Sequence, residues 1–147
     1  MPIRFFYEAL EFKIKHPTKV KQWITETAKK EKRQLSEVNY IFCSDHYLLS
    51  LNQNYLNHNT LTDIITFDNS EGSMIAGEIY ISIDRVNENA AKYDSVLTDE
   101  LHRVMIHGIL HLCGYKDKRS ADKTLMRKKE DAYLSLRKIL FHVKRKG

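Results

Sequence analysis

Several features that would mark other classes of protein are scarce in this chain of 147 residues. It has five glycines and two prolines, too few for a collagen-like repeat or for a Gly/Pro-rich linker between domains. No apolar run approaches the roughly 20 residues that a membrane-spanning helix needs. The N-terminal sequence MPIRFFYEAL lacks the basic start and the apolar stretch of a signal peptide. We therefore expect one domain over residues 1–147, cytoplasmic and without membrane association.

Cysteines are also scarce. The two that are present, Cys43 and Cys113, stand among apolar residues. With no secretory signal ahead of them, we expect both thiols to be reduced and buried. Hydrophobic residues make up 42% of the chain and charged residues 29%, which is the composition of a globular protein and excludes a wholly disordered one.

The net charge of +5 is unevenly distributed along the chain. Residues 1–33 hold nine Lys/Arg against four Asp/Glu, and residues 116–147 hold twelve against four. Residues 34–115 hold three against eleven. Basic segments on both sides of an acidic one indicate an anionic partner such as a nucleic acid, although solvated helix faces give the same pattern. We expect each basic side chain of the last segment, Arg137 included, to be exposed.

Apolar spacing predicts strands early in the chain and helices late. Strands are predicted at residues 3–7, 37–43, 62–67 and 76–83. Helices are predicted at residues 17–33, after Ser44, at 84–93, from Thr98 to Gly114, and at 120–141. Thr98 is expected to cap its helix, and Leu125 and Tyr133 are expected on the buried face of the last one. This order predicts an α+β fold, a small mixed sheet of about four strands packed by helices, with a C-terminal helical part that carries an H-x3-H motif.

The H-x3-H motif is the strongest functional signal in the sequence. His107 and His111 stand four residues apart on a predicted helix, so both imidazoles lie on one face and can bind one metal ion. Gly114 favours a left-handed turn after which the chain can bring Asp117 to the same point. Two imidazoles and one carboxylate leave a position for water, as in a catalytic zinc site. Gly108 stands where zinc proteases carry their glutamate base, so peptide hydrolysis is not expected.

Three blocks of the sequence resemble the YbeY family. HGILHLCGYKD at 107–117 resembles the family signature HGxLHLxGYDH. LNQNYLNHNTLTDIITF at 51–67 resembles a second motif, which ends in a T[DN][VI][LI][ST]F strand, and GEIYIS at 77–82 resembles the G[DE]IxIS strand. The resemblance implies a metal-dependent, single-strand-specific endoribonuclease that acts in 16S rRNA 3′-end processing and in ribosome maturation and quality control.

The resemblance also implies a cofactor and partners. It implies one divalent metal per chain, held by His107, His111 and Asp117, with zinc expected and Mn²⁺, Fe²⁺ or Ni²⁺ left open by the Asp ligand. Ribosomal RNA and the small ribosomal subunit are the implied partners, with small-subunit proteins and an Era-type GTPase as further candidates. We expect the protein to be a monomer.

Two positions depart from the family pattern. Asp117 replaces the usual third histidine, but a carboxylate is an acceptable zinc ligand. Leu56 stands where the family usually has an arginine, so another cation would have to contact phosphate. The candidates beside the proposed ligand are Lys116, Lys118 and Arg119.

The attacking group and the general base stay open at this stage. Either a metal-activated water or the RNA 2′-hydroxyl could attack phosphorus. Glu100, two helical turns before His107, is either a candidate base or a solvated acid of the first turn. His58 and Thr62 are candidate substrate contacts, with a turn residue and an ordinary strand residue as the alternatives.

Two other functions fit the same residues. One is a non-catalytic RNA-binding ribosome-assembly factor with a mainly structural metal, a hypothesis that Leu56 and Gly108 keep open. The other is a metal-dependent hydrolase of a smaller substrate. An Asp117→Ala protein that stays folded and binds RNA without cleaving it would favour the enzyme, whereas unfolding would indicate a structural metal.

Overall fold

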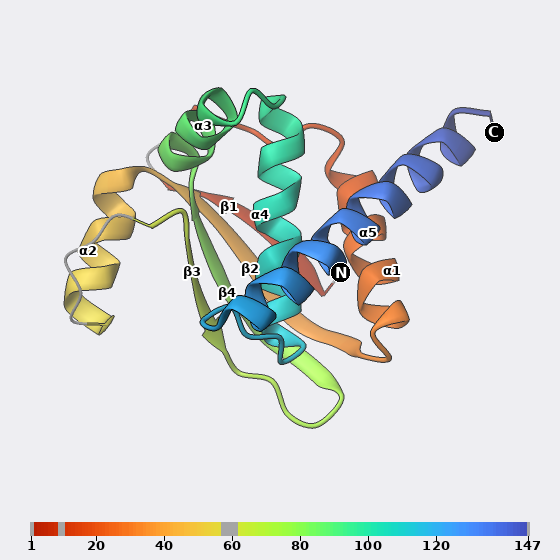
Figure 1. Ribbon diagram of the computed structural model, residues 1–147, viewed down its shortest axis with the longest axis horizontal. Helices are drawn as coiled ribbons and strands as arrows, with labels where there is room; N and C mark the ends of the chain where they lie inside the picture. Colours follow the sequence, from red (N-terminus) through yellow and green to blue (C-terminus); the bar gives the residue numbers. More distant parts are fainter. Residues whose placement is uncertain (1, 9–10, 57–61, 147) are drawn as a thin grey trace.

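The computed structural model describes residues 2–8, 11–56 and 62–146 (Figure 1). Its elements are, in chain order, β1 (Ile3–Tyr7), α1 (Pro17–Lys30), β2 (Gln34–Cys43), α2 (Asp45–Leu56), β3 (Ile64–Asp68), β4 (Met74–Ser82), α3 (Ile83–Lys92), α4 (Leu97–Leu112) and α5 (Ser120–Lys146). The α+β fold class is therefore confirmed. No helix in the described part of the chain is both long enough and apolar enough to cross a membrane.

The four strands form one mixed sheet in the order β1-β2-β4-β3. β1 pairs with β2 and β2 with β4 in parallel, whereas β3 runs antiparallel to β4 at the edge. Parallel neighbours need a crossover connection, and α1 supplies it between β1 and β2. β3 and β4 are instead joined by a short turn between Asp68 and Met74. The first residues of β3 therefore lie at the end of the sheet opposite this turn.

The sheet has a different apolar cluster on each face. Alternate residues of β2 and β4, among them Tyr40 and Ile79, join the main core with residues of α1, α4 and α5. The opposite face carries a smaller cluster, in which Cys43 and Ile65 pack against Leu48 of α2. Figure 1 shows α4 lying across the sheet and α5 crossing over α4. Cys43 and Cys113 are both buried and unpaired, as expected.

Gly108 lets α4 approach the sheet closely. A Cβ atom added there would lie 2.9 Å from Cγ2 of Ile79 and 3.1 Å from Cδ1 of Ile64. This residue therefore faces β3 and β4 and is a packing position of α4. Because it points at the sheet, a glutamate at position 108 could not serve the metal centre in this fold.

The end of α4 follows the prediction, but its start does not. Gly114 has a φ of 103°, and the amides of Gly114 and Tyr115 donate to the carbonyls of His111 and Leu110, which is the Schellman arrangement. At the other end Val96 is the N-cap and makes no side-chain cap bond, so the prediction of Thr98 as the cap is wrong. A tight turn after α3, in which the amide of Ser95 donates to the carbonyl of Ala90, fixes the earlier start.

The buried face of α5 follows the prediction in part, since Tyr133 is buried as expected. Leu125 is 45% exposed, and the face turned inward carries Met126, Glu130, Tyr133 and Arg137. The expectation that Arg137 is exposed is wrong: it is 8% exposed, because this side chain lies between α5 and α4, where it pairs with Asp99. A pattern of apolar residues cannot predict that Glu130 and Arg137, which are charged, lie on the buried face. This explains why the observed face differs from the predicted one.

Candidate metal centre

Three predicted ligands come together where α4 ends. His107 and His111 project from the last two turns of α4, and Asp117 follows in the loop that leads to α5. The facing atoms are Nε2 of His107, Nε2 of His111 and Oδ2 of Asp117. They form a triangle with sides of 2.9, 3.3 and 3.4 Å. In the described residues these three make up the only cluster of His, Cys, Asp and Glu side chains able to hold a metal ion.

The triangle has the dimensions that a small divalent cation requires. Tetrahedral donors at about 2.1 Å from an ion lie about 3.4 Å from one another, close to the observed separations. Two imidazoles and one carboxylate also suit zinc and its neighbours in the first transition row. The donor set therefore fits one ion with a coordination position left for solvent or substrate.

Glu130 of α5 orients His107. The Nδ1–H of His107 donates to Oε2 of Glu130 at 2.7 Å, which turns Nε2 toward the other ligands. Glu130 is 5% exposed, and its other oxygen accepts from Arg103 at 2.8 Å. Burial lowers the pKa of His107, but the hydrogen bond and the charge of Glu130, with other nearby carboxylates, outweigh burial and raise it. A carboxylate behind a ligating histidine makes the imidazole a better donor to a metal.

A backbone carbonyl orients His111. Its Nδ1–H donates to the carbonyl oxygen of Tyr115 at 3.0 Å. The hydroxyl of Tyr115 donates to Oε1 of Glu31 at 2.7 Å, and Tyr133 and Lys129 contact the other oxygen of this carboxylate. Burial alone would raise the pKa of Glu31, but these donors lower it below its usual value. A carboxylate at the end of α1 thus holds the loop on which both Tyr115 and the ligand Asp117 lie.

The ligands lie in a cleft of about 1000 Å³ between α4, β3, α5 and the loop before α5. Its charged lining consists of Asp63, Asp68, Glu100, Arg103, Asp117, Lys118, Arg127 and Glu130. Burial raises the pKa of Asp63 and also that of Glu100. The cleft therefore combines a metal-binding triangle with carboxylates that hold a proton more readily than usual and with basic groups near its rim.

The other residues named from the sequence fall in different places. Glu100, Thr62 and Lys118 line the cleft. Lys116 and Arg119 flank Asp117 in the same loop but do not line the cleft. His58 lies outside the described residues, and Leu56 is the last residue of α2.

Several residues that line the cleft or orient a ligand were not predicted from the sequence, among them Asp63, Arg103, Arg127 and Glu130. Asp63 lies within the predicted strand at 62–67, beside Thr62 in the second motif. Arg103 stands four residues before His107 on the same helix, so helical spacing could have placed it on this face. Glu130 and Arg127 come from α5, which carries no recognisable motif, and only the crossing of α5 over α4 brings them to this site.

Comparison with known proteins agrees with this geometry. Residues 6–138 match the family described as Endoribonuclease YbeY. A curated protein of that name from Cytophaga hutchinsonii is 54% identical over 137 residues, which cover 92% of this chain and 96% of the relative. The chain belongs to the YbeY family. The YbeY of Flavobacterium psychrophilum is 54% identical over 142 residues, with coverage of 97% and 98%.

A solved structure shows the same fold. The solution structure of a protein from Thermotoga maritima superposes with a TM-score of 0.67 at 30% identity, and the match covers 97% of this chain and 93% of that one. The resemblance to the YbeY family seen in residues 51–117 is thus confirmed over almost the whole chain.

Proposed function

We propose that this protein is a metal-dependent endoribonuclease that cleaves single-stranded RNA. The observation that carries the proposal is the triangle of His107, His111 and Asp117 in an open cleft. A structural metal site uses all four positions for protein ligands, whereas three ligands beside open space leave one free for chemistry. The names of the curated relatives supply the substrate class, RNA.

Each part of the cleft has a role in this proposal. A bound divalent ion, zinc or else Mn²⁺, Fe²⁺ or Ni²⁺, supplies Lewis-acid polarisation of a phosphoryl oxygen and lowers the pKa of a nearby water. Lys118 and Arg127 at the rim contact phosphate oxygens in place of the family arginine that Leu56 replaces. Lys116 and Arg119 extend this basic rim along the loop. Thr62, which lines the cleft, contacts the substrate in this proposal.

A carboxylate in the cleft accepts the proton of the attacking hydroxyl, whether that of water or the RNA 2′-hydroxyl. Glu100 and Asp63 both line the cleft, and burial raises the pKa of each toward the range that suits a base at neutral pH. Glu100→Gln and Asp63→Asn separate them. We expect the variant that removes the base to cleave RNA about 100-fold more slowly with unchanged metal content. An unchanged rate removes that residue from the mechanism.

The biological setting is part of the same proposal. We propose that the whole chain acts as one monomeric domain in the cytoplasm, on rRNA of the small ribosomal subunit and at the 3′ end of 16S rRNA. Small-subunit proteins and an Era-type GTPase are the protein partners to test. Cleavage of a 16S rRNA 3′-end precursor, compared with a shuffled RNA of equal length, measures this specificity.

Metal content measured by mass spectrometry, together with RNA cleavage, tests the central claim. We expect about one ion per chain in the wild type and strongly reduced content and cleavage in Asp117→Ala and His111→Ala. Asp122→Ala is the matched control, because it removes a carboxylate close in sequence but outside the ligand triangle. It should keep both metal and activity.

Stability of the same variants separates a catalytic from a structural metal. If Asp117→Ala keeps its helical circular dichroism and binds RNA without cleaving it, the metal serves chemistry. If it unfolds, or if metal-loaded wild type fails to cleave RNA, the protein acts as a ribosome-assembly factor and the proposal is wrong.

A further inference from the structure

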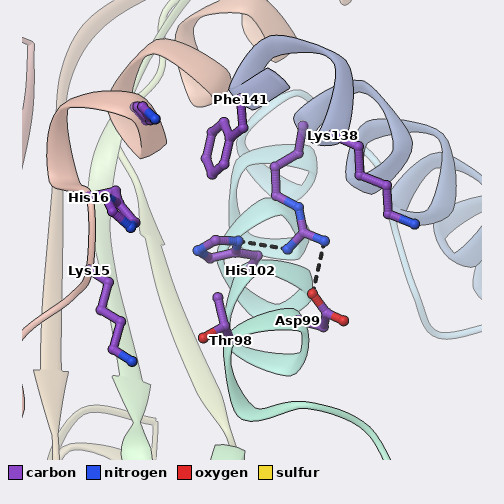
Figure 2. Close-up of a pocket in the computed structure, with 9 residues that line it drawn as sticks. Lys15, His16, Thr98, Asp99, His102, Lys138 and Phe141 are labelled. Carbon is purple, nitrogen blue, oxygen red and sulfur yellow. Dashed lines mark hydrogen bonds and ion pairs between the residues drawn. The ribbon is translucent and has the colours of Figure 1, made fainter. Parts of the chain in front are cut away.

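A second cavity, of about 410 Å³, lies on the opposite face of α4 from the metal cleft (Figure 2). Its walls come from the start of α1, the start of α4 and the later part of α5. Thr98, Asp99 and His102 of α4 face this cavity, whereas His107 and His111 face the cleft. No lining residue is shared between the two, and the volume is in the range of small-molecule sites.

His102, whose side chain is largely buried, presents a hydrogen-bond donor to this cavity. Its side chain is 3% exposed, and Nδ1 accepts a hydrogen bond from Nη1 of Arg137 at 2.7 Å. A guanidinium group only donates, so the ring proton must lie on Nε2. Burial and Arg137 lower the pKa of His102 to about 4, which keeps the ring neutral and retains that proton. Figure 2 shows the far side of the ring turned toward His16, and no described residue accepts from Nε2.

Basic side chains line the same cavity as this donor. Lys15, Lys19 and Lys138 line the cavity, and neither Lys15 nor Lys138 forms an ion pair with a described residue. The one carboxylate in the lining is Asp99, which is bound to Arg137 at 2.9 Å. Arg137 itself is 8% exposed. Its positive charge and the negative charge of Asp99 offset each other, so no carboxylate of the lining is left to offset the charge of the lysines.

The first turns of α1 and α4 lie beside the cavity, which Lys19 of α1 and Thr98 of α4 help to line. Neither N-cap residue, His16 or Val96, makes a side-chain hydrogen bond. Amides of a first turn have no partner within the helix and carry partial positive charge. The first turn of α4 carries acidic residues, so the uncapped first turn of α1, beside lysines and the N–H of His102, is the part of the lining suited to an anion.

We propose that this cavity binds the phosphate group of a nucleotide. Phosphate oxygens accept from Nε2–H of His102 and from the ammonium group of Lys15, while Lys138 lines the other side of the cavity and adds positive charge there. The half-buried ring of Phe141, on the wall beside His102, offers an apolar surface for the attached base. The phosphate can belong to a free mononucleotide or to an RNA strand that continues around α4. The proposal does not depend on cleavage of RNA, because binding is measured without catalysis.

Nuclear magnetic resonance with the metal-loaded full chain tests this site. The single tryptophan, Trp23, lies against His102 with ring centroids 5.4 Å apart, so its indole signal and the amide of Thr98 report on the cavity. Inorganic phosphate and adenosine 5′-monophosphate are titrated separately. We expect saturable shifts of both signals, with tighter binding of the nucleotide.

Variants show whether the lysines hold the phosphate. Lys15→Gln with Lys138→Gln should weaken binding at least tenfold, and Lys128→Gln, an exposed α5 lysine that lines neither cavity, should leave it unchanged. Asp117→Ala should also leave the shifts intact, because the metal cleft lies on the other face of α4. Absence of saturable shifts, an unaltered affinity in the double variant, or loss of the signal in Asp117→Ala would overturn the proposal.

A single-stranded DNA decamer distinguishes the two sources of phosphate, because it carries several phosphates on one strand; its length is checked after the titration. Affinity at least tenfold above that of the mononucleotide, reduced by the double lysine variant, identifies a polynucleotide strand as the occupant. Equal or weaker affinity identifies a free mononucleotide. If the decamer binds tightly but shifts neither Trp23 nor Thr98, the cavity is not a strand site.

Discussion

The two histidines proposed as metal ligands differ in the partner of the second nitrogen of each ring. His111 donates to a backbone carbonyl, and His107 donates to the carboxylate of Glu130, which is itself held by Arg103. A carboxylate contributes negative charge behind the metal as well as orientation, so His107 depends on its partner more strongly. One substitution, at Glu130, can remove the negative charge that distinguishes the partner of His107 from that of His111.

We expect Glu130→Gln to weaken zinc binding by about tenfold, because partners behind a ligating histidine typically contribute 10- to 100-fold to metal affinity. Glutamine keeps the size of the side chain and removes its charge. Competition with a chelator of known affinity measures the change. Asp131→Asn is the matched control, since Asp131 binds the same Arg103 but is exposed. Equal affinities of Glu130→Gln and wild type would contradict this role.

At this scale the sequence predicts the three candidate ligands but not the residues that orient them. His107, His111 and Asp117 lie within eleven residues of one another, so helix periodicity and one glycine turn are enough to bring them together. Glu130 and its hydrogen bond to His107 depend on where α5 crosses α4. That crossing is set by side-chain packing across the whole molecule, which a local pattern does not encode.

At the scale of the element, α4 is held against the sheet by the absence of a side chain at Gly108. Alanine is ordinarily about 1 kcal/mol better than glycine inside a helix. Here the added Cβ would lie 2.9 Å from Ile79, and overpacking costs about 1–3 kcal/mol. The two effects act in opposite directions on the free energy of unfolding. Because the added Cβ would lie so close to the sheet, we expect the destabilising effect to be the larger.

We expect Gly108→Ala to lower the free energy of unfolding by about 1 kcal/mol, measured by urea denaturation. The control is Ala132→Gly at an exposed position of α5, where the usual preference for alanine should hold. If Gly108→Ala is more stable than the wild type, the contact with Ile79 relaxes at no cost and glycine is not required for packing.

The elements themselves were largely predictable. The predicted strand at 37–43 lies within β2 and the helix predicted from Pro17 is α1, because alternation and helical spacing report which face is buried. For α5 the pattern predicted the helix and the burial of Tyr133, but not that Glu130 and Arg137 occupy the inward face. Both charges are bound, one beside the metal centre and one beside the phosphate cavity proposed above. Apolar spacing cannot identify a buried face that is partly charged.

At the scale of the whole molecule, His102 lies where three helices meet. It belongs to α4, its ring packs against Trp23 of α1 at 5.4 Å, and it accepts a hydrogen bond from Arg137 of α5. A protonated ring could not accept that bond and would place two positive charges together. The assembly of α1, α4 and α5 therefore requires neutral His102, which ties global stability to pH.

We expect the free energy of unfolding to fall as pH falls from about 6.5 to 4. Burial and Arg137 lower the pKa of His102 from 6.5 to about 4, so in this window the unfolded chain binds a proton that the folded protein does not. This linkage costs about 1.4 kcal/mol per pH unit, or on the order of 3 kcal/mol over the window. His102→Gln is neutral at every pH, and it should lose this part of the slope in urea denaturation even if it is less stable at pH 7. His46→Gln, which replaces an exposed histidine of α2, should keep the wild-type slope. Parallel curves for wild type and His102→Gln would show that the three helices tolerate a charged ring.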